Sequence, residues 1–232
     1  MKKIQIVVYN VGLGGNILRF LLSLHKNTFP LYRAEYFNKD MPRHEIYSFK
    51  NLHWKHENWA GYETSDAWQK ISTAEYLQKF LAQDDYDTLT VGDHPDEFES
   101  SAGVKLTPTD IDQFEVFKKP NIELSFLTID ISEKYESLIQ DFLKLNQKIG
   151  NFFPLEGSER HNTINELLVK YKKNFHPYSF NHDCFIEGEE SFLEEYKRLL
   201  THLNYTLDED VLTNAMTLYR GWCSARMIKI PK

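Results

Sequence analysis

A glycine-rich turn at residues 10–16, Asn-Val-Gly-Leu-Gly-Gly-Asn, is the segment best suited to chemistry. It follows a β-branched apolar run at 4–9 and precedes an apolar helical pattern at 16–25. Free N–H groups and the dipole at a helix start attract an anion, and glycines let a phosphate approach the backbone closely. We predict a phosphate or sulfate site here, and the alternative is a tight turn without a ligand. The predicted binding residues are Gly12, Leu13, Gly14, Gly15, Asn16 and Ile17.

The turn matches neither of two common phosphate-binding motifs. A GxxxxGK[ST] loop requires a lysine and a hydroxyl residue, whereas Asn16 is followed by Ile17. In a GxGxxG motif that begins at Gly12, the third glycine position holds Ile17. A nucleotide or sugar kinase-like enzyme is one function that we consider. The missing lysine and the missing magnesium-binding hydroxyl disfavour it.

His94 is the candidate general base. It follows an apolar run at 88–91, within Gly92-Asp93-His94-Pro95. Residues after the carboxyl end of a parallel strand line the edge where such sheets bind ligands. An imidazole with a pKa near its usual value of about 6.5 accepts a proton at neutral pH. The alternative is a turn histidine beside a proline.

Other histidines and cysteines are interpreted as structural. His53 and His56 lie three residues apart, whereas the HExxH zinc motif needs four, so we predict no metal site. His182 and Cys184 flank Asp183, and neighbours in a strand point to opposite faces, which disfavours one joint site. We expect Cys184 and Cys223 to be buried, reduced thiols.

Strands alternating with helices predict an α/β fold with a mostly parallel sheet and helices around it, in three layers. The expected strands are 4–9, 88–91, 122–131 and 183–187. The expected helices are 16–25, 66–83, 109–117, 132–149, 158–173, 189–203 and 208–219. In the helix at 189–203, spacing of 3.6 predicts burial of Phe192, Leu193, Tyr196, Leu199, Leu200 and Leu203, with Glu194, Glu195 and Lys197 exposed. Residues 27–65 show no clean period.

Length and composition limit the classes of function. The 232 residues, of which 41% are hydrophobic and 26% charged, predict one soluble domain over 1–232. A net charge of −7 disfavours a nucleic-acid partner, which needs a basic surface. No run of 18 apolar residues and no signal-peptide cleavage pattern occur, so we expect a cytoplasmic protein without a membrane partner. No pattern indicates the oligomeric state.

The glycine-rich turn resembles the first loop of the sulfotransferase family. That family has a P-loop-like α/β fold, and its loop glycines precede a threonine that opens an apolar helix. Gly14 and Gly15 match the glycines, and Asn16 stands at the threonine position. The family's lysine position holds Gly12, and its serine position holds Leu13.

Two further segments resemble the same family, in the same order. Residues 89–95 are similar to a family strand that ends in a catalytic histidine before a proline, which places His94 on the base. Residues 184–190, with the helix that follows them, are similar to the family's C-terminal strand and helix. The family's strand that ends in Arg-Asp-Pro corresponds to 127–132, where the arginine is absent.

The resemblance implies binding of 3′-phosphoadenosine-5′-phosphosulfate (PAPS) or adenosine 3′,5′-bisphosphate, and sulfuryl transfer to a hydroxyl of a small-molecule or glycan acceptor. Arg19 would replace the missing lysine, Ser137 would take a serine position at the 3′-phosphate, and Arg220 would remain from a C-terminal Arg-Lys-Gly loop. Loss of the lysine removes a stabiliser of the transferred group. The alternative is therefore a non-catalytic protein that binds nucleotides or other anions on a degenerate P-loop-like scaffold.

Overall fold

The computed structural model describes residues 1–8, 15–29, 78–93, 121–137, 169, 172–173 and 176–225. The predicted helix at 109–117 and the histidine pair at 53 and 56 lie outside these ranges, as do most of the helices at 66–83, 132–149 and 158–173. Helical turns are present at 78–81 and 133–137.

The described strands form one parallel sheet in the order β2-β1-β3-β4. Strand β1 (Lys2–Val8) lies between β2 (Thr88–Asp93) and β3 (Ile122–Asp130), and β4 (Tyr178–Asn181) pairs with β3. The first strand therefore has a neighbour on each side, and one of them, β2, is the strand that precedes His94. The prediction of a strand at 183–187 is wrong.

Helix α9 (Cys184–Glu187) replaces that expected strand. A short run such as Cys-Phe-Ile fits a buried strand or a buried helical turn equally well. The tertiary packing decides for the helix, because Phe185 is fully buried among aromatic rings. Gly188 follows at φ 122°, which favours glycine, and joins α9 directly to the next helix.

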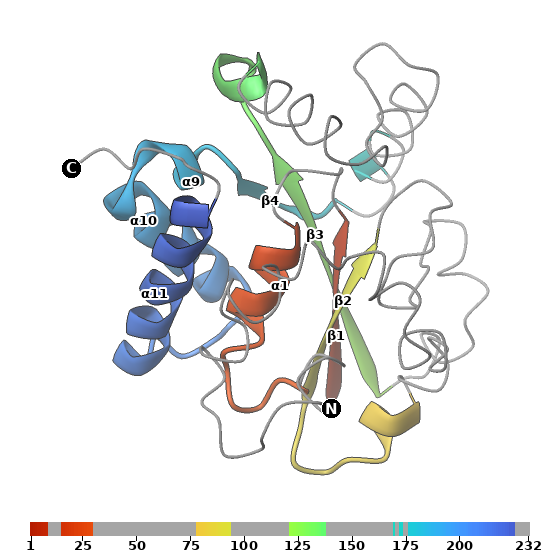
Figure 1. The fold of residues 1–232 in the computed structure, drawn as a ribbon. Helices are drawn as coiled ribbons and strands as arrows, with labels where there is room; N and C mark the ends of the chain where they lie inside the picture. Colours follow the sequence, from red (N-terminus) through yellow and green to blue (C-terminus); the bar gives the residue numbers. More distant parts are fainter. Residues whose placement is uncertain are drawn as a thin grey trace, which may run out of the picture.

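Helices α1 (Gly15–Leu22), α9, α10 (Glu189–His202) and α11 (Glu209–Ala225) lie on one face of the sheet (Figure 1). Helix α1 begins one residue before the expected range of 16–25 and ends at Leu22, so β1 and α1 form the expected P-loop-like strand-to-helix unit. Helix α11 runs past Tyr219, where we expected it to end, to Ala225.

Both faces of the sheet are buried, as a three-layer α/β fold requires. Val7 and Leu127 face the helices and belong to the main core cluster. Ile4, Ile6 and Val8 alternate with Val7 along β1, so they face the other side, and they are also fully buried. The α/β class and the parallel sheet are therefore confirmed.

The apolar face of α10 is almost as predicted. Leu193 is half-buried, and the other predicted core residues are buried: Phe192, Tyr196, Leu199, Leu200 and Leu203. Glu194 and Lys197 are exposed as expected. The expected exposure of Glu195 is wrong, because only 4% of this residue is accessible. Among the described residues, no helix has the length and apolarity needed to cross a membrane.

Candidate functional site

The candidate site lies at the carboxyl edge of the sheet, where β1 ends. The strand order reverses at β1, with β2 on one side and β3 on the other. Ligands of open α/β sheets bind at such a reversal, outside the carboxyl ends of the strands. Val8, the last residue of β1, is in register with Asp93 of β2 and Thr128 of β3. Val8 and Asp93 are therefore the last residues of neighbouring strands, whereas β3 continues two residues further, to Asp130.

Helix α1 places its N-terminus above this edge. It begins at Gly15, seven residues after the end of β1, and packs against β1, β2 and α11. The first four N–H groups of a helix have no partner within it, and they carry the positive end of its dipole. Gly15, Asn16 and Ile17 therefore contribute backbone donors at the helix start. The Ile17 side chain is buried in the core, which leaves its backbone as the only group suited to a ligand.

Arg19 is the most unusual residue of α1. Only 9% of it is accessible, and within the described part of the chain its Nε has no hydrogen-bond partner. Burial of an unpaired cation is costly, and helical side chains lean toward the N-terminus of their helix. The Arg19 side chain is therefore expected to lean over the first turn of α1, where an anion would satisfy it.

Thr128 is a second polar group that the sequence did not single out. It is 1% exposed, and in the described ranges its Oγ1 finds no hydrogen-bond partner. A buried unsatisfied hydroxyl typically costs about 1–3 kcal/mol. Its register with Val8 places it beside the last residue of β1, two residues before the end of β3, with its side chain on the face of the sheet opposite the helices. In the sequence, the only signal was a threonine within an apolar strand.

The remaining predicted residues have different positions. Gly12, Leu13, Gly14 and His94 lie outside the described residues, although Asp93 immediately precedes His94. Ser137 is exposed at the end of the helical segment 133–137. The structure thus brings the start of α1 and the end of β2 to one edge, with Arg19 one turn into that helix, and it leaves the roles of these residues as predictions.

Arg220 does not lie in a loop. The expected end of the helix before residues 220–222 is wrong, because these residues continue α11. The Arg220 guanidinium donates from Nε to Glu189 Oε1 (2.7 Å) and from Nη2 to Oε2 (2.6 Å). This pairing lowers the pKa of Glu189 and raises the pKa of Arg220. The guanidinium already has an anionic partner, so a role in ligand binding would require exchange of that partner.

The two cysteines lie in the core, and neither is in a disulfide, as predicted for reduced structural thiols. Burial, followed by the nearby Glu195 carboxylate, raises the pKa of the Cys184 thiol well above its ordinary value. A thiol that stays protonated is a poor nucleophile. Across the described ranges, no group of three or more His, Cys, Asp or Glu side chains is arranged to hold a metal ion.

The buried thiol makes stability depend on pH in a defined direction. In the unfolded chain, Cys184 loses its proton above about pH 8.5, whereas the folded protein keeps it. Burial raises the pKa of Tyr196 in the same way, above an unfolded value of about 10. The free energy of unfolding is therefore expected to be unaffected by these groups at pH 7 and to fall progressively above about pH 8.5. Urea denaturation at pH 7, 8.5 and 10 measures this, and an unchanged midpoint would contradict it.

Comparisons with known proteins assign no family to this chain. No protein-family model matches the chain, and no curated protein does. Among solved structures, the chain is similar to the crystal structure of a fungal RNA kinase at 12% sequence identity and a TM-score of 0.44. That alignment covers 99% of this chain and 98% of the kinase chain. Similarity at this level transfers no activity, so the functional argument depends on the residues themselves.

Proposed function

We propose that this protein binds a phosphorylated adenosine ligand, such as adenosine 3′,5′-bisphosphate or PAPS, at the carboxyl edge of β1. The observation that carries the proposal is the buried Arg19 Nε without a hydrogen-bond partner in the described residues. It belongs to a helix that starts at this edge, where backbone donors and the dipole also favour an anion. A terminal phosphate or sulfate would satisfy both sets of donors at once.

Ligand binding predicts a gain in thermal stability. At 100 times the dissociation constant, a ligand adds about 2.7 kcal/mol, which corresponds to a rise of about 5–10 °C in Tm for a chain of this size. We expect this rise with adenosine 3′,5′-bisphosphate and a smaller one with inorganic sulfate, in a thermal-shift screen that also contains ATP and GTP. No shift with any of the four at 10 mM would contradict the proposed function.

A second function, sulfuryl transfer, is favoured by the register of β2. Asp93, in register with Val8, is followed directly by His94, so the chain reaches His94 from the same sheet edge. In this reaction, the acceptor hydroxyl oxygen would bond to the sulfur of PAPS, and His94 would take the hydroxyl proton. The bond from sulfur to the phosphate oxygen would break and release adenosine 3′,5′-bisphosphate.

One experiment distinguishes the transferase from the non-catalytic alternative. His94→Ala is expected to abolish transfer to a panel of hydroxyl acceptors and to leave the affinity for adenosine 3′,5′-bisphosphate unchanged. Transfer that survives this substitution would contradict the role of His94. A wild-type protein that binds the ligand and transfers to no acceptor would favour the non-catalytic function.

A further inference from the structure

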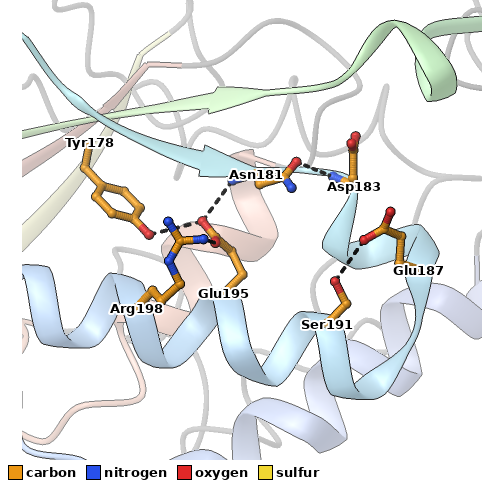
Figure 2. A network of polar contacts seen from close by, with 7 residues as sticks. All are labelled: Tyr178, Asn181, Asp183, Glu187, Ser191, Glu195 and Arg198. Atoms are coloured by element: carbon orange, nitrogen blue, oxygen red, sulfur yellow. Dashed lines mark hydrogen bonds and ion pairs between the residues drawn. The ribbon is translucent and has the colours of Figure 1, made fainter.

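Glu195 is a buried carboxylate on the core-facing side of α10. Its Oε1 accepts hydrogen bonds from the Tyr178 hydroxyl (3.1 Å) and from the Asn181 backbone N–H (3.0 Å), as Figure 2 shows. Its Oε2 accepts from Nη1 of Arg198 (3.1 Å), a side chain that is 68% exposed. Buried polar groups are tolerated when they are hydrogen-bonded. Both Oε1 bonds point to β4, so the carboxylate connects α10 to that strand.

The bond to Asn181 occupies an edge of the sheet. Strand β4 has four residues, and its one partner among the described strands is β3. The N–H of the next residue, His182, donates to the carbonyl oxygen of Asp130 in β3. Since neighbouring N–H groups of a strand alternate in direction, the Asn181 N–H points away from β3. Glu195 therefore supplies the acceptor that a further strand would otherwise provide.

A relay of hydrogen bonds continues from Asn181 toward the candidate site. The Asn181 Oδ1 accepts from the Asp183 N–H (3.0 Å), and the Asp183 Oδ1 accepts from the Ser132 N–H (3.0 Å). Ser132 lies two residues beyond the end of β3 and directly precedes the helical segment 133–137. Three side chains thus connect the interior of α10 to the carboxyl ends of both β4 and β3. Figure 2 shows the part from Glu195 through Asn181 to Asp183.

We propose that Glu195 is a positioning residue for the phosphoanion site. By accepting the Asn181 N–H it fixes the turn at 181–183, and through Asp183 it fixes the chain that leaves β3 beside the crevice with β1. This role rests on the proposed function, because it needs a ligand at that edge. It depends on an acceptor oxygen rather than on charge, because both bonds toward β4 end on Oε1 while the ion pair uses Oε2.

Two substitutions at Glu195 separate the acceptor from the charge. Glu195→Gln keeps a carbonyl acceptor and removes the ion pair, whereas Glu195→Leu removes both. We expect Glu195→Leu to weaken binding of adenosine 3′,5′-bisphosphate by about tenfold, and Glu195→Gln to stay within about threefold of wild type. Glu189→Gln is the matched control, because Glu189 lies on the same helix and forms its ion pair at the surface with Arg220. It is expected to bind as wild type does.

A substitution further along the relay tests the same role in case Glu195→Leu does not fold. Asn181→Ala leaves its own N–H bond to Glu195 intact and removes only the acceptor for Asp183. We expect it to weaken binding by about as much as Glu195→Leu. In both variants, amide hydrogen exchange at 131–133 and 181–183 is expected to accelerate more than exchange in α11, which would distinguish local loosening from general destabilisation.

Failure of the positioning role and failure of the proposed function give different results in these experiments. Absence of binding to the wild-type protein would overturn the proposed function. Binding by the wild-type protein that is unchanged in Glu195→Leu and Asn181→Ala would overturn the positioning role and leave the proposed function intact. Equal loss in Glu195→Gln and Glu195→Leu would show that the charge matters, and it would also overturn the proposal as stated. Calorimetric titration of folded protein with adenosine 3′,5′-bisphosphate measures each of these.

Discussion

Arg19→Met is expected to weaken the binding of adenosine 3′,5′-bisphosphate by about ten- to a hundredfold while leaving the ligand-free protein at least as stable as wild type. Hydrogen bonds to charged groups contribute about 1.5–3 kcal/mol, which corresponds to this range in the dissociation constant. The stability that we expect for the ligand-free variant follows from the burial of Arg19. Met occupies a similar volume without a charge, so the substitution removes a buried guanidinium whose Nε has no hydrogen-bond partner among the described residues.

Arg220→Met provides the matched control for Arg19→Met. Arg220 is also an arginine on a helix of the same face, but it is exposed and its guanidinium is paired with Glu189. We expect its removal to leave ligand affinity unchanged, as measured by calorimetric titration. If Arg19→Met lowered the Tm of the ligand-free protein and left the affinity unchanged, Arg19 would be structural, and the main support for the proposed function would be lost.

Phe185→Ala is expected to lower the free energy of unfolding by about 3–5 kcal/mol, the range for a fully buried aromatic side chain. The Phe185 ring lies 4.7 Å from Trp222 and 5.7 Å from Phe192, measured between ring centroids, and the residue is fully buried. It therefore joins α9 to both α10 and α11, and its removal leaves a cavity that rigid neighbouring rings fill poorly. Urea denaturation measures the change.

Phe185→Leu separates the loss of volume from the loss of the ring. It keeps most of the apolar volume, so it is expected to destabilise the protein by clearly less than Phe185→Ala. A cost below about 1 kcal/mol for Phe185→Ala would show that the aromatic cluster is not the core that the structure describes.

The sheet was predictable where apolar runs are unambiguous. The run at 4–9 is β-branched and flanked by a glycine-rich turn, and it became the central strand within two residues of its expected bounds. The strand at 183–187 was not predictable in this way, because Cys184 and Phe185 suit a helix as well as a strand. The tertiary packing of Phe185 decides the outcome, and no local pattern contains that information.

Glu195 shows a signal that was present in the sequence and given too little weight. It lies three residues after Phe192 and four before Leu199, so the helical period itself places it on the buried face. Its charge argued for exposure, yet its hydrogen-bond donors come from β4, and that strand was not expected where it lies. A charged residue at an apolar position of a helix therefore indicates a buried partner elsewhere in the chain.

The candidate site was predictable in location but not in its side chains. The strand, glycine-rich turn and helix order places an anion-binding helix start at the carboxyl edge of β1, and both flanking elements have the expected type and position. The burial of Arg19 and Thr128 depends on how β3 and the helices pack around β1, which a single sequence does not specify. The alignment of Arg220 with a family loop missed the extension of α11. Gly221 was the one residue there that favours a helix end, and the helix continues through it to Ala225.

The most direct test of the central claim is an NMR titration of the isotopically labelled protein with adenosine 3′,5′-bisphosphate. We expect the largest backbone amide shifts at Gly15, Asn16 and Ile17, together with a shift of the Arg19 Nε–H resonance, because these donors would meet the anion directly. Shifts at Thr128 in the neighbouring strand β3 should saturate at the same ligand concentration. Saturable binding that leaves the start of α1 and Arg19 unshifted would contradict the claim that this helix start is the phosphoanion site.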